Sequence, residues 1–314
     1  MPQQFVWIAA VLRCQRDTDA GADRDLHPID VERLIDGLDQ PTRQDGRVFQ
    51  PSDLRQALAL GQLSVEYQPL VDLLHCTVSG FEALVRWNHP VRGAIPPSEF
   101  IPLAEETGLI EAIGEFVLRQ ACEAAMSWPQ EMGIAVNLSP VQLRSPRLLA
   151  AMEATLHLTG LAPRRLELEV TETAILHDTE ANLTALTALR RLGVHFALDD
   201  FGTGYSSLSY LRRFPFDRLK IDCSFVRELE RSGDCLAIIR AICGLGLQLG
   251  LATTAEGIET EVQLAAVAAA GCNEGQGYLF SQPVPASAIP ALLARLGTRT
   301  ETLRRARFGT EAAA

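Results

Sequence analysis

Short β-like runs alternate with helical stretches from Gly61 to about residue 280, and this alternation constrains the fold more than any other feature. Helices are expected between the runs, and strands separated by helices over this length predict either a (β/α)₈ barrel or a doubly wound open sheet. The first two runs are joined by a short stretch, so they are expected to pair antiparallel. The expected strands are Leu63–Leu70, Val78–Trp87, Ile134–Leu138, Leu166–Val170, Val194–Leu198, Arg218–Ile221, Leu251–Ala255 and Gly277–Phe280.

A polar residue stands near the C-terminal end of each expected strand, and this separates the two folds. In an open sheet only the strands at the switch point contribute to a site, whereas a barrel brings every strand end to one mouth. The pattern therefore favours the barrel, with a site at its mouth. The residues are Gln68, Glu82, Asn137, Glu169, Asp199 with Asp200, Lys220, Glu256 and Gln276.

Six of these residues offer five carboxylates and one amide oxygen, with no cysteine or histidine among them. They are Glu82, Asn137, Glu169, Asp199, Asp200 and Glu256. Such a set suits one or two hard divalent cations such as Mg²⁺ or Mn²⁺, and two ions about 3.5–4 Å apart can hold a nucleophilic water.

The adjacent aspartates and the lysine among these strand-end residues have simpler interpretations when each is taken alone. An Asp-Asp pair such as Asp199-Asp200 is often a helix N-cap, and a lysine such as Lys220 is often a strand-edge side chain that reaches solvent. Among the acids, however, Lys220 would be placed to orient or deprotonate a water, or to neutralise a phosphate oxygen.

Composition narrows the class of protein. A net charge of −11 argues against a general nucleic-acid binder or an anionic-membrane binder, because both need a basic face. Seven cysteines without a Cys-x-x-Cys pair are typical of reduced core thiols in a cytoplasmic protein, Cys122, Cys223 and Cys243 among them. The apolar run 5–12 is too short for a membrane anchor. We expect a linker or the remnant of an upstream region over 1–50, the barrel over 51–296 and a tail over 297–314.

Several short motifs occur in a fixed order and together resemble the EAL domain, a cyclic-di-GMP phosphodiesterase. The strand that holds Glu82-Ala83-Leu84 carries the signature of that family. The others are Tyr67-Gln68-Pro69-Leu70, Phe100–Leu109, Val136-Asn137-Leu138-Ser139, Glu169-Val170-Thr171-Glu172, Asp199–Ser207, Leu219-Lys220-Ile221-Asp222, Ala255–Thr260 and Gln276-Gly277-Tyr278.

The resemblance implies an α/β fold, a modified TIM (β/α)₈ barrel whose first strand runs antiparallel to the others. It also implies Mg²⁺- or Mn²⁺-dependent hydrolysis of cyclic-di-GMP to linear 5′-pGpG. Carried over from the family, one metal has the ligands Glu82, Asn137, Glu169 and Asp199, and the second has Asp199, Asp200 and Glu256. Lys220 would contact the attacking water; Gln68, Leu84, Arg86, Asp222 and Gln276 would hold the substrate; Glu172 and Glu259 would support the site.

The family resemblance also implies a homodimer through the loop 201–208, which Glu259 would steady. The chain has no Gly-Gly-Asp-Glu-Phe signature, so it is not expected to make cyclic-di-GMP. Thr253-Thr254 replace an aliphatic pair of the family and put polar atoms in or beside the core. Two alternatives stay open: a catalytically silent cyclic-di-GMP receptor that signals through a partner, and a barrel hydrolase for another phosphodiester.

Overall fold

The computed structural model describes residues 49–176, 179–202, 211, 213–230 and 233–297. The chain divides into two compact units, Met1–Leu54 and Arg55–Ala314, and the fold below is that of the second unit. The domain limits expected from the sequence remain a prediction. No helix in the described ranges has both the length and the apolar character that crossing a membrane requires.

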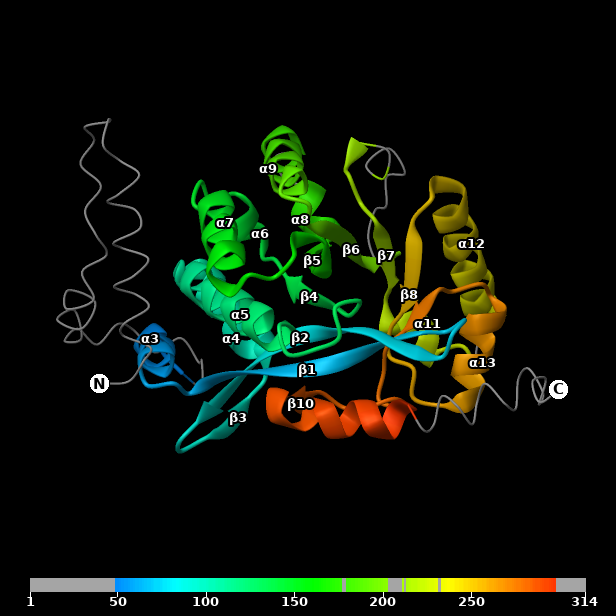
Figure 1. The fold of residues 1–314 in the computed structure, drawn as a ribbon, viewed down its shortest axis with the longest axis horizontal. Coiled ribbons are helices and arrows are strands. Elements are labelled where there is room, and N and C mark those ends of the chain that lie inside the picture. The colour runs from blue at the N-terminus through cyan, green and yellow to red at the C-terminus, as the bar shows by residue number, and fades with distance from the viewer. Residues whose placement is uncertain (1–48, 177–178, 203–210, 212, 231–232, 298–314) are drawn as a thin grey trace. The chain divides into compact units, whose positions relative to one another are not determined.

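Eight strands close into a barrel in the order β1-β9-β8-β7-β6-β5-β4-β2, and β2 pairs again with β1 (Figure 1). β1 is antiparallel to both of its neighbours, and every other neighbouring pair is parallel. This confirms the predicted modified (β/α)₈ barrel with an antiparallel first strand. The strands are β1 (Leu63–Asp72), β2 (Thr77–His89), β4 (Gly133–Asn137), β5 (Leu166–Thr171), β6 (His195–Phe201), β7 (Arg218–Ile221), β8 (Ala252–Ala255) and β9 (Glu274–Gly275).

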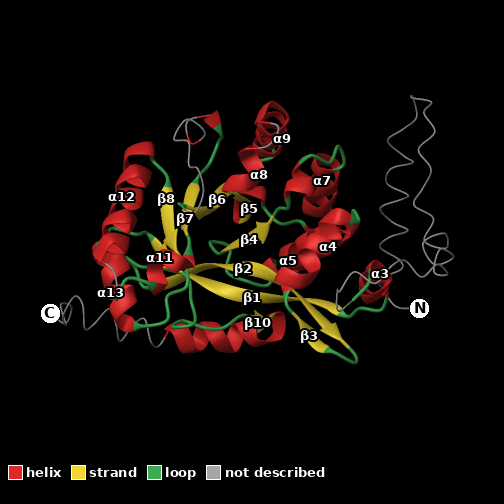
Figure 2. Ribbon diagram, turned by 180° about the vertical axis from the view of Figure 1, so that it is seen from behind, coloured by secondary structure: helices red, strands yellow, loops and turns green. Residues whose placement is uncertain are grey.

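Helices surround the strands, as the red and yellow ribbons of Figure 2 show. Two short strands, β3 (Gly93–Ile95) and β10 (Val284–Pro285), extend the sheet beyond the closed barrel. The helices for which both ends lie in the described ranges are α3 (Pro51–Ala59), which crosses the limit between the two units, α4 (Pro97–Glu106), α5 (Leu109–Ala125), α6 (Pro140–Leu143), α7 (Leu148–Thr159), α8 (Glu172–Leu176), α9 (Thr179–Arg191), α11 (Cys223–Arg227), α12 (Gly233–Leu249) and α13 (Glu261–Ala269), with 3₁₀ turns at Pro163–Arg165 and Ala286–Ala288. Residues 289–297 are also helical.

Local sequence explains several element ends. Ser139 caps α6 through a capping box in which its hydroxyl accepts from the Val141 backbone N–H, while Gln142 bonds back to the Ser139 N–H at 3.2 Å. Gly193 follows α9 with a φ of +94°, a left-handed conformation that glycine adopts without steric cost. Ser139 thus marks where the chain leaves β4, and Gly193 where it turns into β6.

The prediction of a strand over Gly277–Phe280 is wrong. Residues 277–280 form a turn, and the last barrel strand is instead β9. The turn is closed by backbone hydrogen bonds from Phe280 and Ser281 to the carbonyl of Gly277, and Leu279 N–H donates to Ile258. A Cβ on Gly277 would lie 2.1 Å from Ile258 O, so only glycine permits this approach. The apolar run fills space over the barrel end instead of extending the sheet.

The two threonines that replace an aliphatic pair are fully buried, yet both have partners. Thr253 Oγ1 donates to Asn273 Oδ1 at 3.1 Å, and Thr254 Oγ1 accepts from Arg218 Nη1 at 3.0 Å. A buried hydroxyl destabilises a core only when its hydrogen bonds are unmade. Polar atoms in this strand therefore do not imply a loosened core.

Candidate active site

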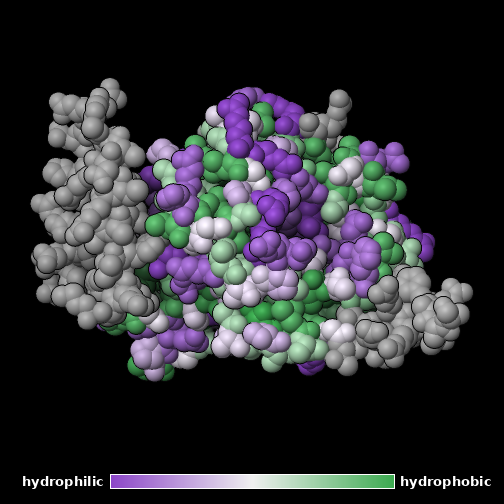
Figure 3. Space-filling model, in the orientation of Figure 1, coloured by the Kyte–Doolittle hydropathy of each residue, from purple (hydrophilic) through white to green (hydrophobic). Residues whose placement is uncertain are grey.

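Lys220 on β7 is 1% exposed and is surrounded by carboxylates from several strands. Its Nζ lies 2.6 Å from Glu256 Oε1 and 2.7 Å from Glu169 Oε2. Asp199 Oδ1 lies at 3.3 Å and Glu82 Oε2 at 3.9 Å. Because these strand ends meet inside a closed barrel, one buried ammonium is shared by four carboxylates. In Figure 3, strongly hydrophilic side chains gather near the middle of the face, over the barrel of Figure 1.

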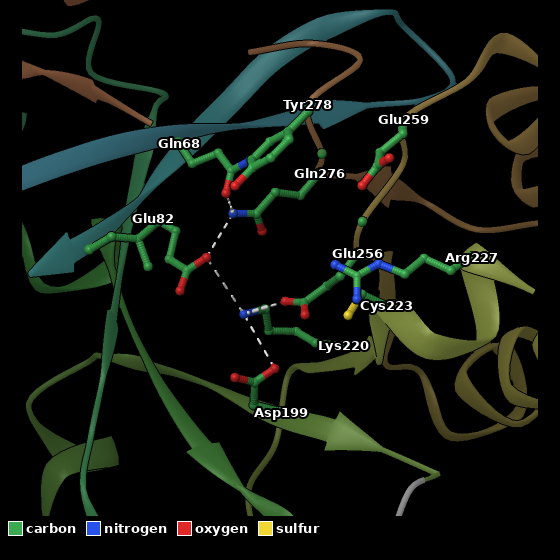
Figure 4. Close-up of a pocket in the computed structure, with 13 residues that line it drawn as sticks. Gln68, Glu82, Asp199, Lys220, Cys223, Arg227, Glu256, Glu259, Gln276 and Tyr278 are labelled. Atoms are coloured by element: carbon green, nitrogen blue, oxygen red, sulfur yellow. Dashed lines mark hydrogen bonds and ion pairs between the residues drawn. The ribbon is translucent and has the colours of Figure 1, made fainter. Parts of the chain in front are cut away.

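A chain of amide side chains fixes the Glu82 carboxylate (Figure 4). Asn137 Nδ2 donates to Glu82 Oε1 at 2.7 Å, and Gln276 Nε2 donates to Glu82 Oε2 at 2.7 Å. Gln276 Nε2 also lies 3.1 Å from Gln68 Oε1, and Gln68 Nε2 donates to the Ser281 carbonyl at 3.2 Å. The antiparallel first strand is what brings Gln68 opposite Glu82 in register.

The adjacent carboxylates of Asp199 and Asp200 need an irregular strand to serve one site, since successive side chains of a regular strand point to opposite faces. The β6–β7 register shifts between Leu198 and Phe201, and Asp200 has a φ of +55°. Aspartate tolerates this left-handed conformation better than most residues, and such an irregularity re-aims a side chain. Burial and the nearby charge of Asp199 raise the pKa of Asp200.

The crowded charges shift the pKa values of Glu169, Glu256 and Lys220. Burial, followed by the charge of Glu82, raises the pKa of Glu169 well above its usual range. Burial raises the pKa of Glu256 to about 8, with Lys220 opposing the rise and Asp199 adding to it. Burial by itself would lower the pKa of Lys220, but the surrounding carboxylates, Asp199 first, raise it well above its ordinary value. One lysine does not compensate four carboxylates, so without a further cation the cluster retains protons near neutral pH.

The oxygen atoms of the cluster are of the chemical type that a hard divalent cation binds. The candidate ligand atoms are all carboxylate or amide oxygens, and Glu169 Oε1 is buried and accepts no hydrogen bond within the described part of the chain. The carboxylate oxygens here converge on Lys220 Nζ, and among the described residues no three carboxylate, histidine or cysteine groups converge on a metal position of their own. Added positive charge would allow all the carboxylates to ionise together.

A solvent-open pocket lies over this cluster, and Glu82, Asp199, Lys220 and Glu256 are part of its lining. Its rim includes three residues that the sequence analysis did not assign to the site: Cys223, Arg227 and Tyr278. Cys223 was expected in the core but lines the pocket and is partly exposed. Cys223 and Arg227 stand four apart on α11, just after Lys220, so helical spacing could have placed them on one face. The pocket is lined by Gln68, Glu82, Leu84, Asp199, Lys220, Cys223, Arg227, Glu256, Gly257, Glu259, Gln276, Gly277 and Tyr278.

Two of the expected substrate-binding residues lie outside the pocket lining. Arg86 follows Glu82 and Leu84 on the same face of β2, but its Nε donates to Glu66 Oε2 at 2.8 Å. Asp222 caps α11 by accepting from the Ser224 backbone N–H at 3.0 Å. Their roles toward a substrate stay predictions.

The two expected supporting residues differ in position. Glu172 is buried at the start of α8, directly after β5. Glu259 is exposed on the pocket rim, where its backbone N–H donates to Gln263 Oε1 at 2.7 Å. Residues 203–208 of the loop that Glu259 was expected to steady, and hence most of the expected dimer contact, lie outside the described residues.

Comparison with known proteins gives a family. The EAL domain matches residues 52–283. The chain belongs to the EAL domain family. MucR of Pseudomonas aeruginosa, named a bifunctional diguanylate cyclase/cyclic di-GMP phosphodiesterase, is 46% identical over 246 residues, which are 77% of this chain and 36% of MucR. An uncharacterized protein of Sinorhizobium fredii is 53% identical over 240 residues, 76% of this chain and 29% of that protein.

A solved structure, the PaMucR phosphodiesterase in complex with c-di-GMP, superposes with a TM-score of 0.73 at 46% sequence identity. The match covers 76% of this chain and 98% of that one. The EAL fold is therefore shared over the whole barrel. This chain spans about a third of the full length of the relatives named above.

Proposed function

We propose that this EAL domain hydrolyses cyclic-di-GMP to linear 5′-pGpG. The observation that carries the proposal is the complete polar cluster under an open pocket: four carboxylates around Lys220 Nζ at 2.6–3.9 Å, in a barrel that resembles a c-di-GMP-bound phosphodiesterase. No position of the family's metal and lysine set is substituted. A silent receptor would be expected to have lost at least one of them.

In the proposed site, two overlapping sets of oxygens would hold Mg²⁺ or Mn²⁺ ions. Bound ions would lower the pKa of a water and neutralise charge on the phosphoryl group. The two sets share Asp199: one is completed by Glu82, Asn137 and Glu169, the other by Asp200 and Glu256.

Hydrolysis forms a bond from the water oxygen to phosphorus and breaks the bond from phosphorus to the ribose 3′ oxygen, which takes up a proton. In the metal-free protein the surrounding carboxylates raise the pKa of Lys220, which favours its ammonium form as a hydrogen-bond donor. Of its three expected roles, orienting the water and neutralising a phosphate oxygen suit an ammonium group, whereas deprotonating the water needs the neutral amine. Gln68 and Gln276 lie on the opposite wall of the pocket, where their amides can contact the dinucleotide.

The direct test is incubation of the purified chain with cyclic-di-GMP, with and without Mg²⁺ or Mn²⁺, and separation of the products by chromatography. We expect metal-dependent appearance of pGpG. If the dinucleotide stays intact although calorimetry shows that it binds, the silent receptor is supported. If generic phosphodiesters are turned over at comparable rates, a barrel hydrolase for another phosphodiester is supported. Light scattering on the same sample tests the proposed homodimer.

A further inference from the structure

The pocket rim is built from three segments that approach one another through two glycines. A Cβ on Gly257 would lie 2.6 Å from Cys223 Cβ, so the loop after β8 packs directly on the first turn of α11. A Cβ on Gly277 would lie 2.1 Å from Ile258 O, so the turn after β9 packs on that same loop. Such close approaches fix the relative positions of the segments. Side chains that project from them are therefore presented to the pocket from a rigid frame.

Positive charge is scarce in this pocket. Among the described residues that line it, Lys220 and Arg227 are the two cations. Lys220 is fully engaged at the floor, where four carboxylates surround it. Arg86 on the neighbouring strand is paired with Glu66 at 2.8 Å. These contacts leave Arg227 as the available cation of the pocket wall.

Arg227 itself is solvent-exposed and, within the described part of the chain, forms no hydrogen bond or ion pair. Figure 4 shows its side chain extending from α11 toward the pocket, on the side of Cys223 and Glu256. Arg227 is near enough to Cys223 to oppose the rise in the pKa of that thiol. An unpaired guanidinium beside a strongly acidic floor is suited to an anionic ligand group.

We propose that Arg227 is a specificity-determining residue that binds the phosphodiester of the substrate that is not being cleaved. The inference rests on the proposed function and deepens it. Cyclic-di-GMP carries two phosphodiester anions, of which one must lie over the carboxylate cluster to react. The second anion then lies in a pocket whose floor repels it, and a guanidinium on the rim offers it a charge-assisted hydrogen bond.

The test compares Arg227→Ala and Arg227→Lys with a matched control, Arg240→Ala, in which an exposed arginine of α12 outside the pocket is removed. We expect Arg227→Ala to raise KM for cyclic-di-GMP about tenfold, with a smaller fall in kcat. Arg227→Lys keeps the charge and should recover most of the loss. The rise in KM caused by Arg227→Ala should be smaller for bis(p-nitrophenyl) phosphate, which has one phosphodiester. Rising salt concentration should reduce the difference in KM for cyclic-di-GMP between the parent and Arg227→Ala.

Three outcomes overturn the proposal: a KM for Arg227→Ala equal to that of Arg240→Ala, an equal loss on both substrates, or a loss that lysine does not recover. The last would indicate a two-point contact with a guanine edge, which only the planar guanidinium can make. If the parent binds cyclic-di-GMP without cleaving it, the proposed function fails but this inference does not. The same variants are then compared by calorimetry, where Arg227→Ala should weaken Kd about tenfold and a parental Kd would refute it.

Discussion

Glu256→Gln should make the metal-free protein more resistant to unfolding at alkaline pH, although it removes a proposed metal ligand. The carboxylate of Glu256 is 80% buried and shares Lys220 with three other carboxylates, so its ionised form is disfavoured in the fold. Glutamine has nearly the same shape and mimics the neutral acid. The variant therefore removes a charge that the folded state accommodates poorly.

The sign and the size of the effect on the free energy of unfolding follow from the pKa of Glu256. In the fold the pKa of Glu256 is raised to about 8, whereas in the unfolded chain it is near 4.5. Between these values the unfolded chain has released the proton while the fold retains it, so the free energy of unfolding falls as pH rises. From about pH 5 to about pH 8 the loss reaches at most about 4 kcal/mol, since one pKa unit corresponds to about 1.4 kcal/mol. Coupling within the cluster shares the proton among several carboxylates and reduces this figure.

Urea unfolding in EDTA at about pH 5, 6.5 and 8 measures the effect. We expect the parent to lose stability across this range and Glu256→Gln to lose less, so that the difference between them grows with pH. Glu153→Gln, which replaces an exposed carboxylate on α7, is the matched control and should follow the parent. Parallel pH profiles for the parent and Glu256→Gln would refute the charge-excess argument.

Three further changes test the site and its frame. Glu82→Ala should lower turnover by about two orders of magnitude or more while circular dichroism stays native, and parental activity would remove Glu82 from the site. Lys220→Ala should spare Mn²⁺ affinity in a titration but slow the chemical step, so lost affinity would mean that the role of Lys220 is wrong. Gly277→Ala should lower the free energy of unfolding by about 1–3 kcal/mol because its Cβ meets Ile258 O. Gly244→Ala, in open space on α12, should be neutral or stabilising, and urea unfolding measures both glycine variants.

The sequence predicted the barrel because strand-end polar residues are visible without coordinates. Closure of the sheet then brings residues as distant as Gln68 and Gln276 within hydrogen-bonding distance. The turn at 277–280 was misassigned since an apolar run of that length reads equally as a strand, and only the contact with Ile258 distinguishes the two. Local pattern carries no information about such a long-range contact.

The directions and contacts of single side chains were harder to predict than the fold. Nothing in the sequence reports the strand irregularity that accommodates Asp199 and Asp200 at the same strand end. The partner of Arg86, Glu66, lies across a hairpin, so its contact depends on the β1–β2 register. Arg227 was missed because helix α11 is short and lacks a clear apolar stripe, although the four-residue spacing from Cys223 was available.

The barrel interior holds two layers of charged side chains that differ in their excess of negative charge. Arg218 lies one layer below Lys220 in the barrel. Its Nε is 3.0 Å from Glu167 Oε1 and its Nη1 is 2.6 Å from Glu274 Oε2, so one guanidinium forms ion pairs with two carboxylates. A buried ion pair is tolerated better when charge and hydrogen bonds are matched, and here one guanidinium donates to both carboxylates and leaves an excess of one negative charge. The layer of Lys220 has four carboxylates for one ammonium, an excess of three. The same excess that destabilises the metal-free fold at alkaline pH is thus what a pair of divalent cations would neutralise.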